Sequence, residues 1–175
     1  AMSSFLLVGI DKVKLKLNIG GGSYTDGKQI VVGLPELFFY KTREEILISL
    51  IALIGHESQH VKSSSFIAFK EYQEKMLKFL TKGAKLNINQ VKMVAHAIGN
   101  SLEDGRIERI LCNNYKGYIN KIKFLNGTIW KESSVRKQEL SDFIFTITTL
   151  SVTGLYPRGF EFYKNTRPIY YREAG

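Results

Sequence analysis

The stretch that decides the fold of this chain reads Ile51-Ala52-Leu53-Ile54-Gly55-His56-Glu57-Ser58-Gln59-His60-Val61-Lys62. It continues an apolar helical pattern and predicts a buried central helix over residues 43–61. A capping box at Thr42-Arg43-Glu44-Glu45 predicts where this helix starts. His56 and His60 lie four positions apart, so they share one helix face and can direct both imidazoles at one metal ion.

Glu57 lies one position round the helix from His56, where its carboxylate reaches a metal-bound water more easily than the metal itself. Zinc suits such a site because it takes imidazole nitrogens and lowers the pKa of a bound water towards about 7. Glu57 would accept a proton from that water and pass it to a leaving amine. His56-Glu57-Ser58-Gln59-His60 is a His-Glu-x-x-His motif. It uses two of the three histidines of the chain, which favours a metal site over a chance pair on an ordinary helix.

A third ligand is expected on a later helix, because catalytic zinc usually takes three protein ligands and leaves the fourth position to water. Glu103 is the first candidate, and Asp104 is the alternative. His96 and Asn100 share a helix face with Glu103, so they are further candidates for a ligand, or for groups that orient a ligand or bind substrate. The competing interpretation is a solvated helix face with weak ion pairs over residues 103–108.

The flanking patterns predict an α+β fold. Alternation over residues 13–18 predicts a strand, the Asp26-Gly27 pair predicts a hairpin, and Gln29-Ile30-Val31-Val32-Gly33-Leu34 reads as the returning strand of a small antiparallel sheet packed on the motif helix. Further helices are expected over residues 66–80, from Asn87 or Asn89 to Leu111 with Gly105 inside, and over 115–124 and 139–150.

The length of 175 residues predicts a single domain, with the sheet and motif helix at about 5–62, a helical part at about 66–150 and an irregular tail at 151–175. No apolar run approaches the roughly 18–20 residues of a membrane span, so no membrane partner is expected. With no signal peptide and one cysteine, Cys112, the sequence is typical of a cytoplasmic protein.

The net charge of +9 has two interpretations. The lysines are spread along the chain, without the block of like charges that marks a nucleic-acid-binding tail, which favours a solvated basic surface. The functional alternative is attraction to an acidic partner such as DNA, RNA or a cell-wall polymer.

His-Glu-x-x-His at residues 56–60, together with Asn-x-x-Glu-Asp-x-Arg-Ile-Glu at residues 100–108, resembles the pattern of the gluzincin metallopeptidases, whose third zinc ligand is a glutamate. More narrowly, the chain is similar to metallopeptidase domains of bacterial and phage proteins that often precede a von Willebrand A-like domain. The matching stretches are Tyr24 to Lys28 with the following strand, Gly55 to Lys62, Asn100 to Glu108, and Thr153 to Pro157. The resemblance covers most of the chain.

The resemblance implies a zincin-like fold, a zinc ion held by His56, His60 and Glu103, and Glu57 as general base and acid. It also implies a protein or peptide substrate that pairs with an edge strand at Gln29, Ile30, Val31 and Val32. Because no von Willebrand-like segment follows, the sequence is interpreted as a domain excised from a longer protein. Tyr156, Tyr163 and Tyr170 are candidates to cover the cleft or to donate to an oxyanion.

The sequence therefore favours a zinc-dependent endopeptidase. Two alternatives belong to other classes of protein. One is a catalytically inert zincin-like scaffold, and the other is a basic nucleic-acid-associated module with a structural or vestigial metal site.

Overall fold

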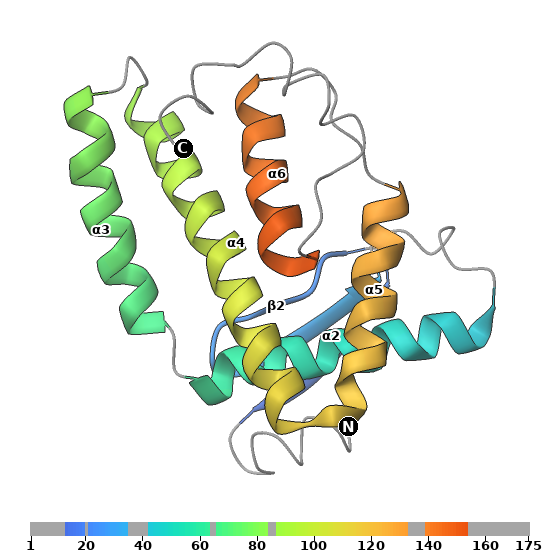
Figure 1. Ribbon diagram of the computed structural model, residues 1–175. Helices are drawn as coiled ribbons and strands as arrows, with labels where there is room; N and C mark the ends of the chain where they lie inside the picture. The colour runs from blue at the N-terminus through green and yellow to red at the C-terminus, as the bar shows by residue number, and fades with distance from the viewer. Residues whose placement is uncertain are drawn as a thin grey trace. The chain divides into compact units, whose positions relative to one another are not determined.

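A computed structural model of the chain describes residues 13–19, 21–34, 42–63, 66–83, 87–132 and 139–153. Within these ranges the fold is α+β, as predicted, with one small sheet and five α-helices (Figure 1). In chain order the elements are β1 (Lys14–Ile19), β2 (Tyr24–Thr25), β3 (Gln29–Leu34), α2 (Arg43–Ser63), α3 (Phe66–Gly83), α4 (Ile88–Asn114), the 3-10 turn η2 (Lys116–Tyr118), α5 (Ile119–Glu132) and α6 (Glu139–Thr153).

The chain divides into two compact units. Unit 1 holds the described residues of Ala1–Lys70 and Arg106–Thr128, and unit 2 holds those of Glu71–Gly105 and Ile129–Gly175. The chain passes between the units within α3, α4 and α5, so each unit takes part of these helices. The three tail tyrosines lie outside the described residues.

The sheet has the strand order β1-β3-β2 and is mixed, so the prediction of an antiparallel sheet is wrong in one of its two pairings. β1 pairs with β3 in parallel, with Leu15 opposite Ile30, whereas β2 and β3 are antiparallel. The physical reason is that the alternating pattern of a strand has a period of two in either direction. Alternation located β1 correctly but could not give its direction.

The Asp26-Gly27 pair forms the predicted hairpin, which joins β2 to β3. Gly27 has a φ of 84°, a left-handed conformation that glycine adopts at little cost. Asp26 Oδ1 accepts hydrogen bonds from the backbone amides of Lys28 and Gln29, both at 2.8 Å. The amides of Gln29 and Lys28 hold the pKa of the Asp26 carboxyl below its ordinary value of 3.8.

β3 is the central strand, which corrects the prediction that Gln29–Leu34 is an open edge for a peptide. β1 occupies one side of β3, and β2 occupies the other at Ile30 and Val31. Beyond β2, the Ser23 hydroxyl donates to the Gly33 carbonyl and accepts from the Gly33 amide, both at 3.1 Å. This side chain takes the place of the missing strand, so the free edges of the described sheet belong to β1 and β2.

One face of the sheet packs on the motif helix, as predicted. Ile30 and Val32, two positions apart on β3, are buried against Ile54 of α2. Half-buried apolar residues surround this cluster: Val13, Leu15, Leu50, Leu53 and Val61. The sheet thus packs on the face of α2 that carries Leu50, Ile54 and Val61.

Helix α2 begins at the predicted capping box. The Thr42 amide donates to Glu45 Oε2 and the Glu45 amide donates to Thr42 Oγ1, each at 3.1 Å. A second reciprocal cap starts α4, where Asn87 Oδ1 accepts from the amides of Asn89 and Gln90 while Gln90 Oε1 accepts from the Asn87 amide. Asn87 is therefore the cap of α4, one of the two candidates that the sequence left open.

The second core of unit 1 joins α2 to the end of α4 and the start of α5. Ala52, Leu111, Ile122 and Leu125 are buried together. A Cβ atom added at Gly55 would lie 2.1 Å from a ring carbon of Tyr118, so this tight helix contact requires a glycine. The helix predicted over residues 115–124 is preceded by the 3-10 turn and extends to Glu132.

Unit 2 explains the glycine inside α4. A Cβ atom at Gly105 would lie 2.5 Å from the backbone oxygen of Ser151 in α6. The same contact is reinforced by the Ser151 hydroxyl, which donates to the Ser101 carbonyl at 2.6 Å. Gly105 is thus a position where α4 and α6 pack closely.

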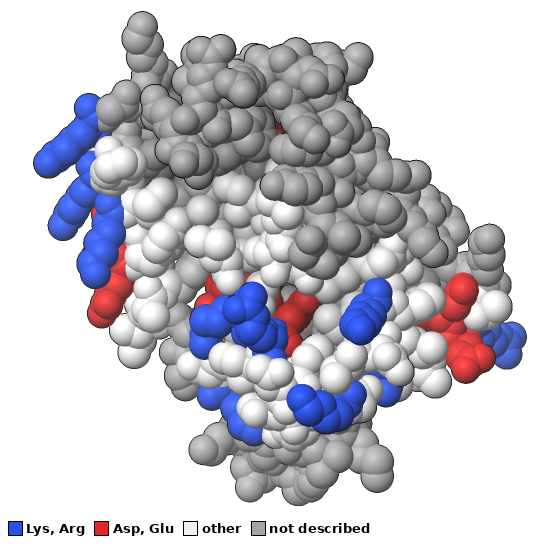
Figure 2. Space-filling view, viewed as in Figure 1, with Lys and Arg blue, Asp and Glu red and all other residues white. Residues whose placement is uncertain are grey.

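Basic and acidic side chains appear in several groups over the face of the molecule drawn in Figure 2, rather than in one continuous patch. Among the described residues, no helix combines the length and the apolar character needed to cross a membrane.

Candidate metal centre

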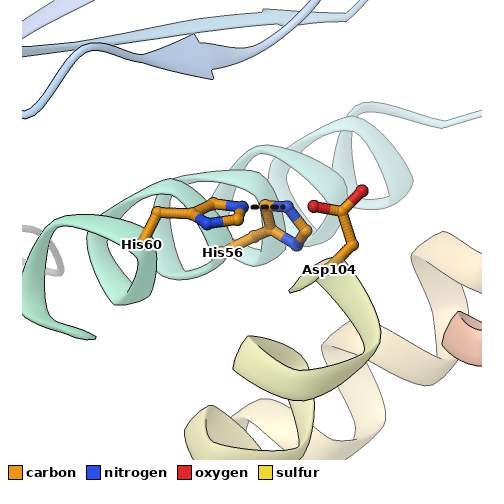
Figure 3. A group of neighbouring side chains, drawn as sticks. All are labelled: His56, His60 and Asp104. Atoms are coloured by element: carbon orange, nitrogen blue, oxygen red, sulfur yellow. Dashed lines mark hydrogen bonds between the residues drawn. The ribbon is translucent and has the colours of Figure 1, made fainter. Parts of the chain in front are cut away.

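His56 and His60 converge as their spacing predicts. Their Nε2 atoms lie 3.2 Å apart, and the two rings meet edge to face with centroids 4.9 Å apart (Figure 3). Both histidines are partly buried and project from consecutive turns of α2. Two imidazole nitrogens therefore face the same small volume.

This separation fits the donor set of a zinc ion. Two Zn–N bonds of about 2.05 Å at the tetrahedral angle would place the two nitrogens about 3.3 Å apart. The distance in the structure, 3.2 Å, is within a tenth of an ångström or so of that value. In the structure the two nitrogens are hydrogen-bonded to each other (Figure 3), and the same separation is compatible with both binding one ion once that hydrogen is lost.

The carboxylate that joins them is that of Asp104. Among the described residues, ligand atoms of His56, His60 and Asp104 all lie within 4.8 Å of one another. Asp104 stands at the end of unit 2, but α4 continues without a break into unit 1, so Asp104 lies one turn before Glu108. Asn100, a turn earlier, donates from Nδ2 to Asp104 Oδ2 at 3.1 Å.

The other predicted candidates lie elsewhere on α4. Glu103 is half-buried and is not a member of the group formed by the two histidines and Asp104. His96 is exposed, and its Nδ1 lies 2.7 Å from Nε2 of Gln73 in α3. The structure therefore places the alternative candidate, Asp104, near the two histidines, and Asn100 lies beside Asp104.

Glu108 orients His56. Its Oε1 lies 3.1 Å from His56 Nδ1, and its Oε2 accepts from Asn126 Nδ2 at 2.8 Å. Both Glu108 and Asn126 are buried, at 5% and 6% exposure. An ionised carboxylate can only accept hydrogen bonds, so Nδ1 of His56 carries the hydrogen and Nε2 keeps its lone pair for a metal.

Sequence reasoning missed Glu108 as a site residue, because it read residues 103–108 either as a source of one ligand or as a solvated face. The signal was present in the spacing: Asp104 and Glu108 are four apart, and Leu111 continues their helix face into the core. Asn126 carried no comparable signal, since it comes from α5 and reaches Glu108 only through the packing of unit 1.

Glu57, the predicted general base, is buried at 5% exposure next to His56 in α2. Ser58 and Gln59, which follow it, are buried as well. Burial of an ionisable side chain is costly unless the group is paired or has a chemical role. The position of Glu57 is thus compatible with its predicted role.

Comparison with known proteins gives no relative from which a function could be transferred: no family model matches the chain, and no curated protein or solved structure matches it significantly.

Proposed function

We propose that this protein is a zinc-dependent metallopeptidase with a zincin-like site. The observation that carries the proposal is the convergence of two imidazole Nε2 atoms, 3.2 Å apart, on one face of the His-Glu-x-x-His helix with a carboxylate beside them. The sheet packed on that helix supports the zincin-like part of the proposal. The gluzincin resemblance is modified in one respect, since the geometry favours Asp104 over Glu103 as the third ligand.

His56, His60 and Asp104 would hold the metal, and Glu108 would keep His56 in the ligating tautomer. Zinc bound there would supply Lewis acidity towards a peptide carbonyl and towards water. Asn100 would hold the Asp104 carboxylate in place through its hydrogen bond to Oδ2. His56 and Asp104 therefore each have a described group that fixes them.

Glu57 would act as general base and then as general acid. Its carboxylate would accept a proton from the attacking water and return it to the amine of the cleaved bond. Burial keeps Glu57 away from bulk water, where hydration would weaken its interaction with the reacting groups. The substrate would be a protein or peptide.

The test begins with the metal content of purified wild-type protein and of three variants, measured by mass spectrometry. We expect about one zinc per chain in the wild type. His56→Ala and Asp104→Ala should lose the zinc, whereas Glu103→Ala should keep it. Loss with Glu103→Ala and retention with Asp104→Ala would restore the glutamate ligand of the gluzincins.

Hydrolysis is tested separately, with a peptide library and the isosteric variant Glu57→Gln. This variant should keep its zinc and lose cleavage, because an amide cannot accept the proton. Equal cleavage by wild type and Glu57→Gln would exclude Glu57 as the base. A wild-type protein that binds no zinc even after zinc is added would overturn the proposed function and leave the inert scaffold.

A further inference from the structure

A row of polar side chains leads away from the candidate metal centre along α4. Asp104, Asn100 and His96 follow one another at intervals of four residues. Residues four apart lie on one side of a helix and are separated by about 6 Å along its axis. Asn100 is therefore about 6 Å and His96 about 12 Å from the level of Asp104. The side chains of Asn100 and His96 are both exposed.

Gln73 of α3 completes this row. Unit 2 holds Gln73 together with the other three residues, and its parts of α3 and α4 lie side by side (Figure 1). Gln73 Nε2 lies 2.7 Å from His96 Nδ1, so Gln73 stands at the same level of the row as His96. We call Asp104, Asn100, His96 and Gln73 the α4 polar row.

The two amides of the row each have one defined orientation. Asn100 Nδ2 donates to Asp104 Oδ2 at 3.1 Å, and an ionised carboxylate can only accept, so Asn100 must turn its Oδ1 away from Asp104. Gln73 likewise directs its nitrogen at His96, and a nitrogen of this kind can only donate. In the part of the chain that the structure describes, neither amide oxygen has a hydrogen-bond partner. The row thus presents two acceptors.

The spacing of these two acceptors fits an extended polypeptide. Such a chain rises about 3.3 Å per residue and directs every second N–H to the same side, at intervals of about 6.6 Å. The levels of Asn100 and Gln73 are separated from Asp104 by one and two steps of about 6 Å. When the carbonyl of the cleaved bond lies at the metal centre, the main-chain N–H groups two and four residues away therefore reach these two levels.

A peptide substrate also needs partners other than the strand that the sequence suggested. β3 pairs with β1 on one side and with β2 on the other, so Gln29–Leu34 is not an open edge. The α4 polar row lies on the helix that supplies Asp104, next to the two histidines. Uncharged amide oxygens accept from main-chain N–H groups, which all residues except proline carry.

We propose that the α4 polar row is a substrate-binding subsite that holds a polypeptide in extended form along α4. Asn100 Oδ1 accepts the main-chain N–H two residues from the cleaved bond, and Gln73 Oε1 accepts the one four residues away. The inference rests on the proposed function and deepens it. Both are positioning residues, and they select the main chain of the substrate, so that a residue without an N–H is rejected at either position.

The test uses zinc-loaded full-length protein and hydroxamates, whose zinc-binding group fixes the position of an attached peptide. Acetohydroxamate contains this group alone. Two tetraalanine hydroxamates carry it at the carboxyl end and at the amino end, and so cover both directions of the peptide along α4. We expect calorimetric titration to show that one of the two binds at least about tenfold more tightly than acetohydroxamate, through two added hydrogen bonds.

N-methylation of that peptide identifies the hydrogen bonds individually. A methyl group on the nitrogen two residues from the zinc-binding group should weaken binding by wild-type protein about three- to tenfold, and so should one four residues away. In Asn100→Leu the first methyl group should have no effect, and in Gln73→Leu the second should have none. Each variant is compared with its own affinity for acetohydroxamate, so a change in the metal centre does not enter the comparison.

Asn113→Leu is the matched control. Asn113 is exposed and comes nine positions after Asp104, which places it on the opposite side of α4. This variant should respond to both methyl groups as the wild type does. Methyl effects that persist in Asn100→Leu and Gln73→Leu, or that disappear in Asn113→Leu, would overturn the proposal.

The acetohydroxamate titration separates the two levels of the argument. A protein that binds acetohydroxamate, and binds neither tetraalanine hydroxamate more tightly, keeps its metal centre and overturns the subsite alone. A protein that binds neither zinc nor acetohydroxamate overturns the proposed function and the subsite together.

Discussion

Replacement of Glu108 by glutamine tests the least expected part of the site. The carboxylate accepts from His56 Nδ1 through one oxygen and from Asn126 through the other, at 3.1 and 2.8 Å. A glutamine of the same shape has one acceptor oxygen, so it can satisfy only one of these two donors. The side chains of His56 and Glu108 are only 14% and 7% exposed, so water cannot readily replace the lost acceptor.

The expected effect falls on metal affinity. Loss of a group that orients a metal-bound histidine typically costs 10–100-fold in affinity, which is about 1.4–2.7 kcal/mol. Because the glutamine also loses the negative charge, we expect Glu108→Gln in the upper half of that range. The assay is a zinc competition titration against a chromophoric chelator near neutral pH. Glu74→Gln, which removes an exposed carboxylate of α3, is the matched control.

Two outcomes would refute this reasoning. A folded Glu108→Gln protein that binds zinc within about twofold of the wild-type affinity would show that Glu108 does not orient a ligand. An equal loss in Glu74→Gln would show that only the total charge of the protein matters.

Two predictions concern the scaffold. Gly105→Ala should lower the free energy of unfolding measured in urea, because a methyl group 2.5 Å from the Ser151 oxygen forces α4 and α6 apart. The cost of this overpacking, about 1–3 kcal/mol, exceeds the gain of about 1 kcal/mol in helix propensity. Gly117→Ala is the control, since its methyl group meets open space and should cause no such loss. The hairpin should weaken in acid: the pKa of Asp26 is lowered from 3.8, so its contribution is complete above that pH and disappears as the pH falls through the lower, folded value. The amide chemical shifts of Lys28 and Gln29 should therefore titrate with a midpoint below pH 3.8 in the wild type and lose this titration in Asp26→Asn. A midpoint at or above pH 3.8 would show that these two amides do not lower the pKa of Asp26.

The helices were predictable because their signals are local. Thr42 and Glu45 form the expected capping box, and Asn87, one of the two predicted candidates, caps α4. The sheet was predictable only in part. Alternation marked β1 and the Asp26-Gly27 pair marked the β2–β3 hairpin, but the parallel pairing of β1 with β3 depends on how the chain passes across the sheet. No short sequence pattern encodes that path.

The histidine pair was predictable for the same reason as the caps, since a spacing of four positions on one helix sets its geometry. The third ligand was not, because Glu103 and Asp104 are consecutive and differ by about 100° around α4. Which of them faces His56 depends on the rotation of α4. That rotation is set by tertiary contacts at Ile107, Leu111 and Gly105, which lie far apart in the sequence from their partners.

The position of Glu108 provides an independent argument for Asp104. A ligand and the group that orients the first histidine come from one helix here, four positions apart, opposite two histidines that are also four apart. If α4 turned by one residue to present Glu103, the position four residues later would be Ile107, which cannot accept a hydrogen bond from His56 Nδ1. The rotation that presents Asp104 supplies both carboxylates, whereas the rotation that presents Glu103 supplies one. Zinc affinity in Asp104→Ala and in Glu108→Gln should therefore fall together, while Glu103→Ala leaves both interactions in place.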